Sequence, residues 1–145
     1  MKQKSTVTFI DKMAFDVELN GHHFTIDAGA GVGGENKGPS PKGLMLSALG
    51  GCTGMDVVSI LRKMKVTEYT LDIDVSGELT EEHPKIYHTI TVEFNFTGNN
   101  LPESKIRKAV ELSETRYCGV SEMLRKASEM KIKININGEE ICLRK

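Results

Sequence analysis

Two cysteines have neighbours that could support thiol chemistry. Cys52 lies between glycines in the run SALGGCTGMDVVSILRKM, and Cys118 lies in TRYCGVSEML. The thiolate is the nucleophilic form of cysteine, and it is stabilised by nearby cations and by helix N-termini. Cys118 is expected at a helix start, where unpaired N–H groups favour the thiolate and Arg116 could add positive charge. Cys52 is expected in mid-helix, where it becomes nucleophilic only if a cation or a hydrogen-bond donor reaches it.

The competing interpretation of each cysteine is a small buried hydrophobic residue. None of the three cysteines lies in a C-x-x-C pair, and no Cys/His group has zinc-finger spacing, so no metal site is predicted. Three cysteines are too few for a secreted disulfide scaffold, but two could form a transient catalytic disulfide in a reducing compartment. Cys142 is expected on the outer face of a terminal hairpin, and no catalytic role is assigned to it.

A long helix is expected to position Cys52, within residues 39–65. Ser40 suits a helix cap, and Pro41 suits the first helical position. Apolar residues surround almost the whole helix, which is typical of a buried one. The glycines around Cys52 each cost roughly 1 kcal/mol in a helix interior, which favours close approach by another backbone or by a substrate.

The remaining segments predict strands, two further helices and two tight hairpins. Val7 and Phe9 are expected to point inward from a first strand, and Asn20-Gly21 predicts a hairpin that pairs Val17 with Phe24. An antiparallel strand pair is expected over residues 69–75 and 86–96. A helix from Pro102 is expected to point Ile106, Ala109, Val110 and Ser113 inward, and the apolar residues of a further helix are Val120, Met123, Leu124, Ala127 and Met130. A terminal hairpin is expected to pair Ile134 with Ile141 and Ile132 with Leu143.

This pattern predicts a single α+β domain over residues 1–145, with antiparallel sheets around a long buried central helix. So apolar a helix needs more cover than one small chain supplies, which favours a homodimer. The formal charge of −1 disfavours nucleic acid. We expect no membrane association, because no signal peptide and no run of membrane-spanning length is recognised, and we expect a cytoplasmic protein without a cofactor.

Residues 28–39 form a glycine-rich loop whose Gly29, Gly31 and Gly34 match G-x-G-x-x-G. We reject a dinucleotide site, because the preceding strand belongs to a hairpin and no helix begins at the glycines. A mobile lid beside Cys52 and a plain linker are the two remaining interpretations.

The run GPSPKGLML with SALGGCTGMDVVSILRKM, and the later YCGVSEML, resemble the two cysteine motifs of the OsmC/Ohr family of thiol peroxidases, in its OsmC-like branch. The order of elements is similar over essentially the full chain. The resemblance implies an OsmC-like fold and an intertwined homodimer. It also implies that Cys52 attacks a hydroperoxide, that Cys118 resolves the sulfenic acid as a disulfide, and that a dithiol then reduces this disulfide.

Two positions depart from the family's organic hydroperoxide reductases. Those enzymes have a glutamate about ten residues before the first cysteine, where this chain has Lys42 and Gly43, and an arginine in the N-terminal strands, whereas the first arginine here is Arg62. The candidates to replace this Arg–Glu pair, each of them also a normal surface residue, are Lys42, Lys37, Glu35, His22 and His23.

Two functional hypotheses follow. The first is reduction of organic hydroperoxides by Cys52 and Cys118, as peroxide detoxification in oxidative stress. The second is a non-catalytic protein that binds a small apolar molecule, with the cysteines as redox sensors or as packing residues. The retained cysteine pair favours the first hypothesis, and the missing Arg–Glu pair favours the second.

Overall fold

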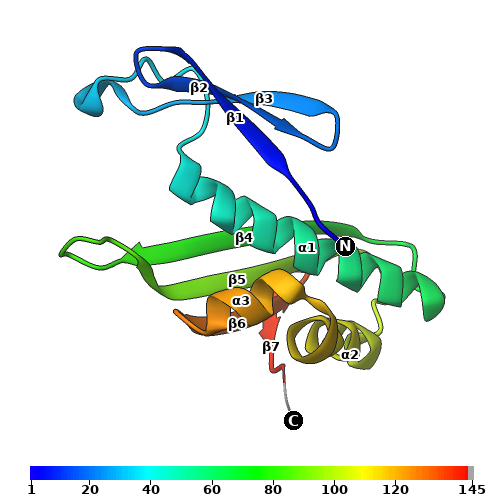
Figure 1. Cartoon of the computed structure of the whole chain (residues 1–145). Helices are drawn as coiled ribbons and strands as arrows, with labels where there is room; N and C mark the ends of the chain where they lie inside the picture. The colour runs from blue at the N-terminus through cyan, green and yellow to red at the C-terminus, as the bar shows by residue number, and fades with distance from the viewer. Residues whose placement is uncertain (144–145) are drawn as a thin grey trace. The chain divides into compact units, whose positions relative to one another are not determined.

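The structure is a computed structural model that describes residues 1–143 (Figure 1). The chain forms two compact units, Met1–Met45 and the part from Leu46 onward, and the boundary falls inside helix α1 (Pro41–Lys63). Each unit has its own sheet. The first unit contains the strands β1 (Ser5–Asp11), β2 (Ala14–Leu19) and β3 (His22–Ile26) and the 3-10 turn η1 (Ala30–Val32).

The sheet of the first unit is antiparallel, in the order β1-β2-β3. The hairpin predicted at Asn20-Gly21 is confirmed, because Val17 pairs with Phe24 and Phe15 pairs with Ile26. Two-residue turns match the right-handed twist of the strands they join, which is why this short signal sets the register of the whole hairpin.

Strand β1 is exposed along its whole length, so the prediction that Val7 and Phe9 point inward is wrong. Val7 is 52% exposed and Phe9 is 59% exposed, whereas Ala14 and Val17 on β2 are buried. Alternation along a strand identifies the two faces of a sheet, but it does not show which face is covered. The strand therefore carries apolar side chains that its own unit leaves open.

Asp27 anchors the glycine-rich segment that follows β3. Its carboxylate accepts backbone hydrogen bonds from Ala28 at 2.7 Å and from Glu35 and Lys37 at 3.1 Å each. These bonds hold the pKa of Asp27 below its ordinary value, and the bond from the Lys37 backbone has the largest effect. A mobile lid and a plain linker both remain open as interpretations of residues 28–39, and these three bonds count against a mobile segment.

Replacing Asp27 with alanine is expected to speed amide exchange at Ala28, Glu35 and Lys37 at neutral pH. Because the pKa of Asp27 is lowered on folding, its stabilising contribution is present above the unfolded pKa of about 3.9 and is lost as the pH falls through the folded pKa. Hydrogen exchange measured along a pH series checks both points, with Asp72→Ala as an exposed control. Equal exchange in Asp27→Ala and the parent protein would show that the carboxylate is not the anchor.

The second unit carries the remaining part of α1 and the elements after it. These are β4 (Thr70–Leu79), β5 (Tyr87–Thr97), α2 (Glu103–Leu112), a π-helical turn η2 (Ser113–Tyr117), α3 (Gly119–Arg125), β6 (Glu129–Ile136) and β7 (Glu139–Ile141).

The sheet of the second unit has the order β4-β5-β6-β7. Strands β4 and β5 are antiparallel as predicted, with Ile73 opposite Phe94. Strands β5 and β6 are parallel, which corrects the prediction of antiparallel pairing throughout. The chain leaves β5 through α2 and α3 and returns in the same direction, as a crossover connection requires. Periodicity predicts each strand but not the direction of its neighbour.

The terminal hairpin is confirmed in part. Ile134 pairs with Ile141 as predicted, but β7 ends at Ile141, so Ile132 and Leu143 do not form the predicted ladder pair. Leu143 instead packs against the hydrophobic core as a partly buried side chain.

The core of the second unit lies between its sheet and its helices, which cover one face of that sheet (Figure 1). Residues at alternate positions of β5 point to this face, because successive side chains of a strand point to opposite faces of the sheet. The central buried side chains are Leu49, Val57 and Leu61 from α1, Ile90, Val92, Phe94 and Phe96 from β5, Ile106, Ala109 and Val110 from α2, and Ile134 from β6.

Helix α1 begins at Pro41 as predicted, but it is not buried on all sides. Its buried residues Leu49, Thr53, Val57 and Leu61 recur every fourth position and form one stripe. Met55, on another face, is 77% exposed. The prediction of a fully buried helix is therefore wrong for a single copy of the chain.

Two of the glycines near Cys52 lie where α1 passes β4. A Cβ atom on Gly50 would lie 3.1 Å from Val75 Cγ2, and one on Gly54 would lie 2.8 Å from Ile73 Cδ1. The sequence predicted close approach by another backbone or by a substrate, and at Gly50 and Gly54 the structure shows close approach by side chains of β4 instead. A Cβ atom on Gly51 would meet nothing within 4 Å.

By length and composition α1 could cross a membrane, which corrects the expectation that no run reaches that length. The central helix of a soluble protein meets the same criterion, and α1 contributes a buried stripe to the core of the second unit.

The two later helices agree with the sequence pattern in part. Ile106, Ala109 and Val110 are buried on α2 as predicted, and Ser113 is buried in the π-helical turn. Helix α3 ends at Arg125, so Met130 lies on β6 rather than on a helix. Met123 is 65% exposed and is not a core residue.

Candidate functional site

The site is built from α1, the π-helical turn and the start of α3, all within the second unit. Cys52 and Asp56 are four residues apart on α1 and therefore lie on one face of that helix. Cys118 directly precedes α3 as its N-cap residue, and its backbone N–H donates to the Ser113 carbonyl at 2.9 Å. A π-helical turn widens a helix locally and recurs at functional sites. This turn brings Ser113 and Cys118 to the face of α1 that carries Cys52.

The two sulfur atoms and a carboxylate oxygen of Asp56 all lie within 4.8 Å of one another. Cys52 is half-buried and Cys118 is buried. The structure thus brings together the two cysteines that the sequence motifs indicated, although 66 positions separate them in the chain (118 minus 52). Cys142 is exposed, and its backbone carbonyl accepts a 2.6 Å hydrogen bond from Arg107 Nε.

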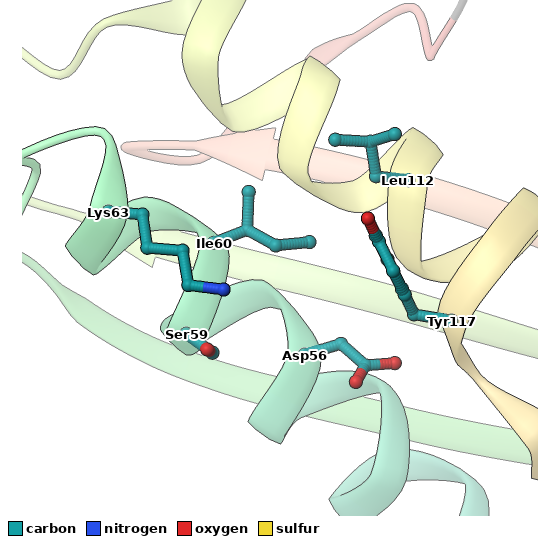
Figure 2. Close-up of a pocket in the computed structure, with 6 residues that line it drawn as sticks. All are labelled: Asp56, Ser59, Ile60, Lys63, Leu112 and Tyr117. Atoms are coloured by element: carbon teal, nitrogen blue, oxygen red, sulfur yellow. The ribbon is translucent and has the colours of Figure 1, made fainter.

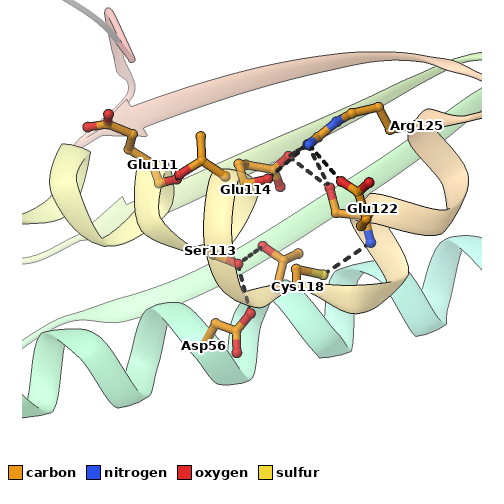
Figure 3. Close-up of polar contacts among 10 residues, drawn as sticks. Asp56, Glu111, Ser113, Glu114, Cys118, Glu122 and Arg125 are labelled. Atoms are coloured by element: carbon orange, nitrogen blue, oxygen red, sulfur yellow. Dashed lines mark hydrogen bonds and ion pairs between the residues drawn. The ribbon is translucent and has the colours of Figure 1, made fainter.

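Hydroxyl groups hold Asp56 in place beside the thiols (Figure 3). Ser113 Oγ lies 3.0 Å from Asp56 Oδ2 and 3.1 Å from Thr53 Oγ1. A hydroxyl has one proton and an ionised carboxylate only accepts, so Ser113 donates to Asp56 and Thr53 donates to Ser113. Sequence reasoning missed Asp56, and its spacing of four residues from Cys52 was the signal that could have found it.

The environment of Cys118 disfavours its thiolate. The Ser121 backbone N–H donates to Cys118 Sγ at 3.3 Å, as expected at a helix start. Burial outweighs this bond and, with smaller contributions from Cys52 and Glu114, raises the pKa of the Cys118 thiol to about 11. The expectation of a stabilised thiolate at Cys118 is therefore wrong. Arg116 stacks on the ring of Tyr117, 5.6 Å from its centroid.

The Cys118 thiol is expected to titrate with a midpoint at about 11, above the ordinary value of about 8.5. The raised pKa also predicts that stability falls as the pH rises above the unfolded pKa through about 11, because in this range the unfolded state releases the thiol proton that the folded state still holds. The thiolate absorbance difference between the parent protein and Cys118→Ser isolates this titration from the tyrosines. A midpoint near 8.5 would mean that burial is not the dominant influence.

Glu114 is a buried carboxyl group on the same π-helical turn. It is 6% exposed, and its Oε2 atom accepts from the Ser121 hydroxyl at 2.9 Å and from Arg125 at 3.3 Å (Figure 3). Among the described residues its Oε1 atom has no partner. Burial raises the pKa of Glu114 despite these two donors. A buried carboxyl group thus lies on the segment that carries Cys118.

Three of the residues suggested to replace the Arg–Glu pair have partners within the first unit. Glu35 forms ion pairs with Lys37 at 3.1 Å and with Lys12 at 3.3 Å. His23 Nδ1 lies 2.9 Å from Asp16, and this hydrogen bond raises the pKa of His23.

A cavity of about 280 Å³ is lined in part by Asp56, whose carboxylate lies within 4.8 Å of both sulfur atoms (Figure 2). Its other lining residues are Ser59, Ile60 and Lys63 from α1, Leu112 from the end of α2 and Tyr117 from the π-helical turn. The apolar side chains of Ile60, Leu112 and Tyr117 thus line the cavity together with the Asp56 carboxylate and the Lys63 ammonium group. Such a cavity suits a small molecule with an apolar body and a polar group.

Comparison with known proteins identifies a family and several related structures. The family model described as OsmC-like protein matches residues 34–133. Protein YhfA of Escherichia coli strain K12 is 36% identical over 125 residues, which cover 86% of this chain and 90% of YhfA. A crystal structure of a hypothetical protein from Aquifex aeolicus has 27% identity and a TM-score of 0.83, covering 94% of this chain and 97% of that one.

The crystal structure of an organic hydroperoxide resistance protein OsmC from Legionella pneumophila has a TM-score of 0.67. The match covers 93% of this chain and 97% of that one, at 13% identity, and so shows a shared fold. The observed architecture of two sheets and three helices is thus one that solved proteins also adopt.

Proposed function

Because this chain belongs to the OsmC-like protein family, we propose that it reduces organic hydroperoxides through the pair Cys52 and Cys118. Family membership supports a peroxide-related redox role. The observation that carries the finer proposal is the approach of the two sulfur atoms to within 4.8 Å of each other. A lone buried cysteine would have no partner to resolve its oxidised form.

The half-buried Cys52 is proposed as the attacking thiol. Its thiolate attacks the terminal oxygen of the hydroperoxide, the O–O bond breaks, and the alkoxide leaves as an alcohol after taking up a proton. Cys52 becomes a sulfenic acid, so the sulfur is oxidised by two electrons and the peroxide is reduced by two.

Cys118 is proposed as the resolving thiol. Its sulfur attacks the Cys52 sulfenic acid, the S–S bond forms, and the displaced hydroxide leaves as water with the thiol proton. A thiol with a pKa of about 11 still carries that proton at neutral pH, which agrees with this role better than with the first attack. A cellular dithiol then reduces the disulfide by two electrons, as expected in a cytoplasmic setting.

The cavity beside Asp56 supports an organic rather than an inorganic peroxide. Ile60, Leu112 and Tyr117 offer apolar contact to a carbon skeleton, and hydrogen peroxide has no such skeleton to bury. The Legionella pneumophila neighbour is described as an organic hydroperoxide resistance protein, which is consistent with this substrate class.

A specific observation favours the second candidate function, a redox sensor or a protein that binds a small apolar molecule. Burial raises the pKa of the Cys118 thiol. A raised pKa opposes thiolate formation, which the Arg–Glu pair of the family's reductases would promote.

Consumption of cumene hydroperoxide and of hydrogen peroxide, each with dithiothreitol as reductant, separates the two functions. Faster turnover of cumene hydroperoxide is the expected result. Absence of turnover with either peroxide would reject the enzymatic proposal and leave the binding protein.

The proposed working form is a homodimer that buries the outer face of α1. Met55 is 77% exposed, Gly51 faces open space, and a shallow surface hollow there is lined by Gly50, Gly51, Gly54, Met55, Val58, Ser59 and Arg62. A second copy of the same helix would offer matching apolar side chains, and small residues let two helices approach closely. The dimer would also explain why so apolar a helix has only one stripe buried within its own chain.

A further inference from the structure

The proposed peroxide reaction uses the two thiols at the site but gives the Asp56 carboxylate beside them no role. The two thiols and the Asp56 carboxylate have their ligand atoms within 4.8 Å of one another, and they come from two different helical segments. Zinc in a tetrahedral site has S–Zn bonds of about 2.3 Å, which places two sulfur ligands roughly 3.8 Å apart. Small side-chain rotations therefore bring this cluster to coordination distance.

We propose that Cys52, Cys118 and Asp56 together bind one thiophilic divalent cation of the zinc type. Both thiols lose their protons on binding, and the carboxylate contributes the third ligand, which leaves a fourth position for water. The sequence alone disfavoured a metal site because it has neither C-x-x-C nor zinc-finger spacing. The ligands meet only because the π-helical turn carries Cys118 to α1.

Outer hydrogen bonds of the kind that orient metal ligands are already in place. The Ser113 hydroxyl donates to Asp56 Oδ2 at 3.0 Å, and the Ser121 backbone N–H donates to Cys118 Sγ at 3.3 Å. Such contacts fix ligand orientation and are part of metal sites in general. Here they hold one oxygen and one sulfur of the cluster and leave the second Asp56 oxygen for a cation.

A divalent cation would also supply the counter-charge that the bound state needs. Once both thiols have given up their protons on binding, the cluster carries two thiolates and one carboxylate in a partly buried place, and such a group of like charges is unfavourable without a counter-ion. A divalent cation compensates most of this charge, and soft sulfur ligands select zinc over magnesium. The lining cation Lys63 remains on the cavity wall.

One consequence rests on the proposed function: an occupied site cannot reduce peroxide, because both sulfur atoms are coordinated. Metal binding would then inhibit turnover reversibly and would protect the thiols from oxidation. The binding itself does not depend on peroxidase activity, so it is tested on the reduced protein without peroxide.

The test is titration of the full chain with Co²⁺ under a phosphine reductant, followed by displacement with Zn²⁺. One Co²⁺ per chain with thiolate-to-cobalt charge-transfer absorption is expected, and Mg²⁺ should not compete. Cys52→Ser and Cys118→Ser should lose the absorption, and Asp56→Asn should weaken binding roughly 10- to 100-fold or more. Cys142→Ser and Asp72→Asn, which alter an exposed thiol and an exposed carboxylate, are the matched controls.

A second measurement needs no variant. Zn²⁺ should protect Cys52 from alkylation in the parent protein and leave Cys142 reactive.

Three results of the titration would each overturn the site: absence of the cobalt absorption in folded, reduced protein, unchanged affinity in Asp56→Asn, or loss of binding in Cys142→Ser. Failed binding with intact peroxide turnover would reject this inference alone, and intact binding without turnover would reject only the proposed function.

Discussion

Replacing Cys52 with serine is expected to reduce the consumption of cumene hydroperoxide by roughly a thousandfold or more. A serine hydroxyl is a far weaker nucleophile than a thiolate, and Cys118 cannot take over because burial raises the pKa of its thiol to about 11. Steady-state turnover with dithiothreitol measures the loss, and circular dichroism confirms that the variant is folded.

The matched variant Cys118→Ser should behave differently. Cys52 should still react once and form a sulfenic acid that dimedone traps, but the disulfide should not form. Cys142→Ser should keep full turnover, because Cys142 is exposed and its described contact is a backbone one with Arg107. A sulfenic acid that forms without a following disulfide distinguishes the resolving thiol Cys118 from the attacking thiol Cys52, and a loss of turnover alone would not distinguish them.

Peptide mapping after one equivalent of peroxide checks the same scheme in the parent protein. The expected product links Cys52 to Cys118 and leaves Cys142 free. The sulfur atoms lie within 4.8 Å of each other, and a disulfide needs about 2.05 Å, so one or both sulfur atoms must move by up to a few ångströms. A linked Cys142, or a folded protein whose Cys52 stays reduced, would contradict the mechanism.

Replacing Met55 with aspartate is expected to convert a dimer into a 16.0 kDa monomer at micromolar concentration. Met55 is 77% exposed on an apolar helix face, and a charge placed at the centre of an apolar interface lacks both water and a partner. Central interface side chains contribute about 2 kcal/mol or more, so the dissociation constant should rise at least roughly thirtyfold. Sedimentation of both proteins over a concentration series measures the change.

Met123→Asp is the control for this experiment. Met123 is 65% exposed on α3, so it tests a charge placed on a different helix. We expect it to leave the assembly unchanged. A parent protein that sediments only as a monomer, or a Met55→Asp variant that remains as dimeric as the parent, would reject the proposed interface.

Local patterns in the sequence predicted much of the fold. The Asn20-Gly21 turn set the register of Val17 with Phe24, since a two-residue hairpin leaves only one alignment for its strands. Pro41 marked the first residue of α1, because its missing N–H is unused at that position. The stripe of Ile106, Ala109 and Val110 predicted the inner face of α2.

Predictions that depended on what covers a surface were less successful. Val7 and Phe9 alternate correctly but are exposed, and α1 is apolar on several sides but has a single buried stripe. The strand β6 was predicted, but its parallel pairing with β5 was not. Each of these properties depends on a neighbour that is distant in the chain, and periodicity contains no information about it.

The sequence by itself determined the elements, the hairpin registers and the two cysteines worth examining, because these depend on residues within a few positions of one another. Only the tertiary structure decided that Cys52, Cys118 and Asp56 meet, because α1 and the π-helical turn are joined by two strands and a helix. It also decided the protonation of Cys118. A helix start favours its thiolate, but burial between packed segments raises its pKa to about 11, and the desolvation of a charge is set by the whole surroundings rather than by the local sequence.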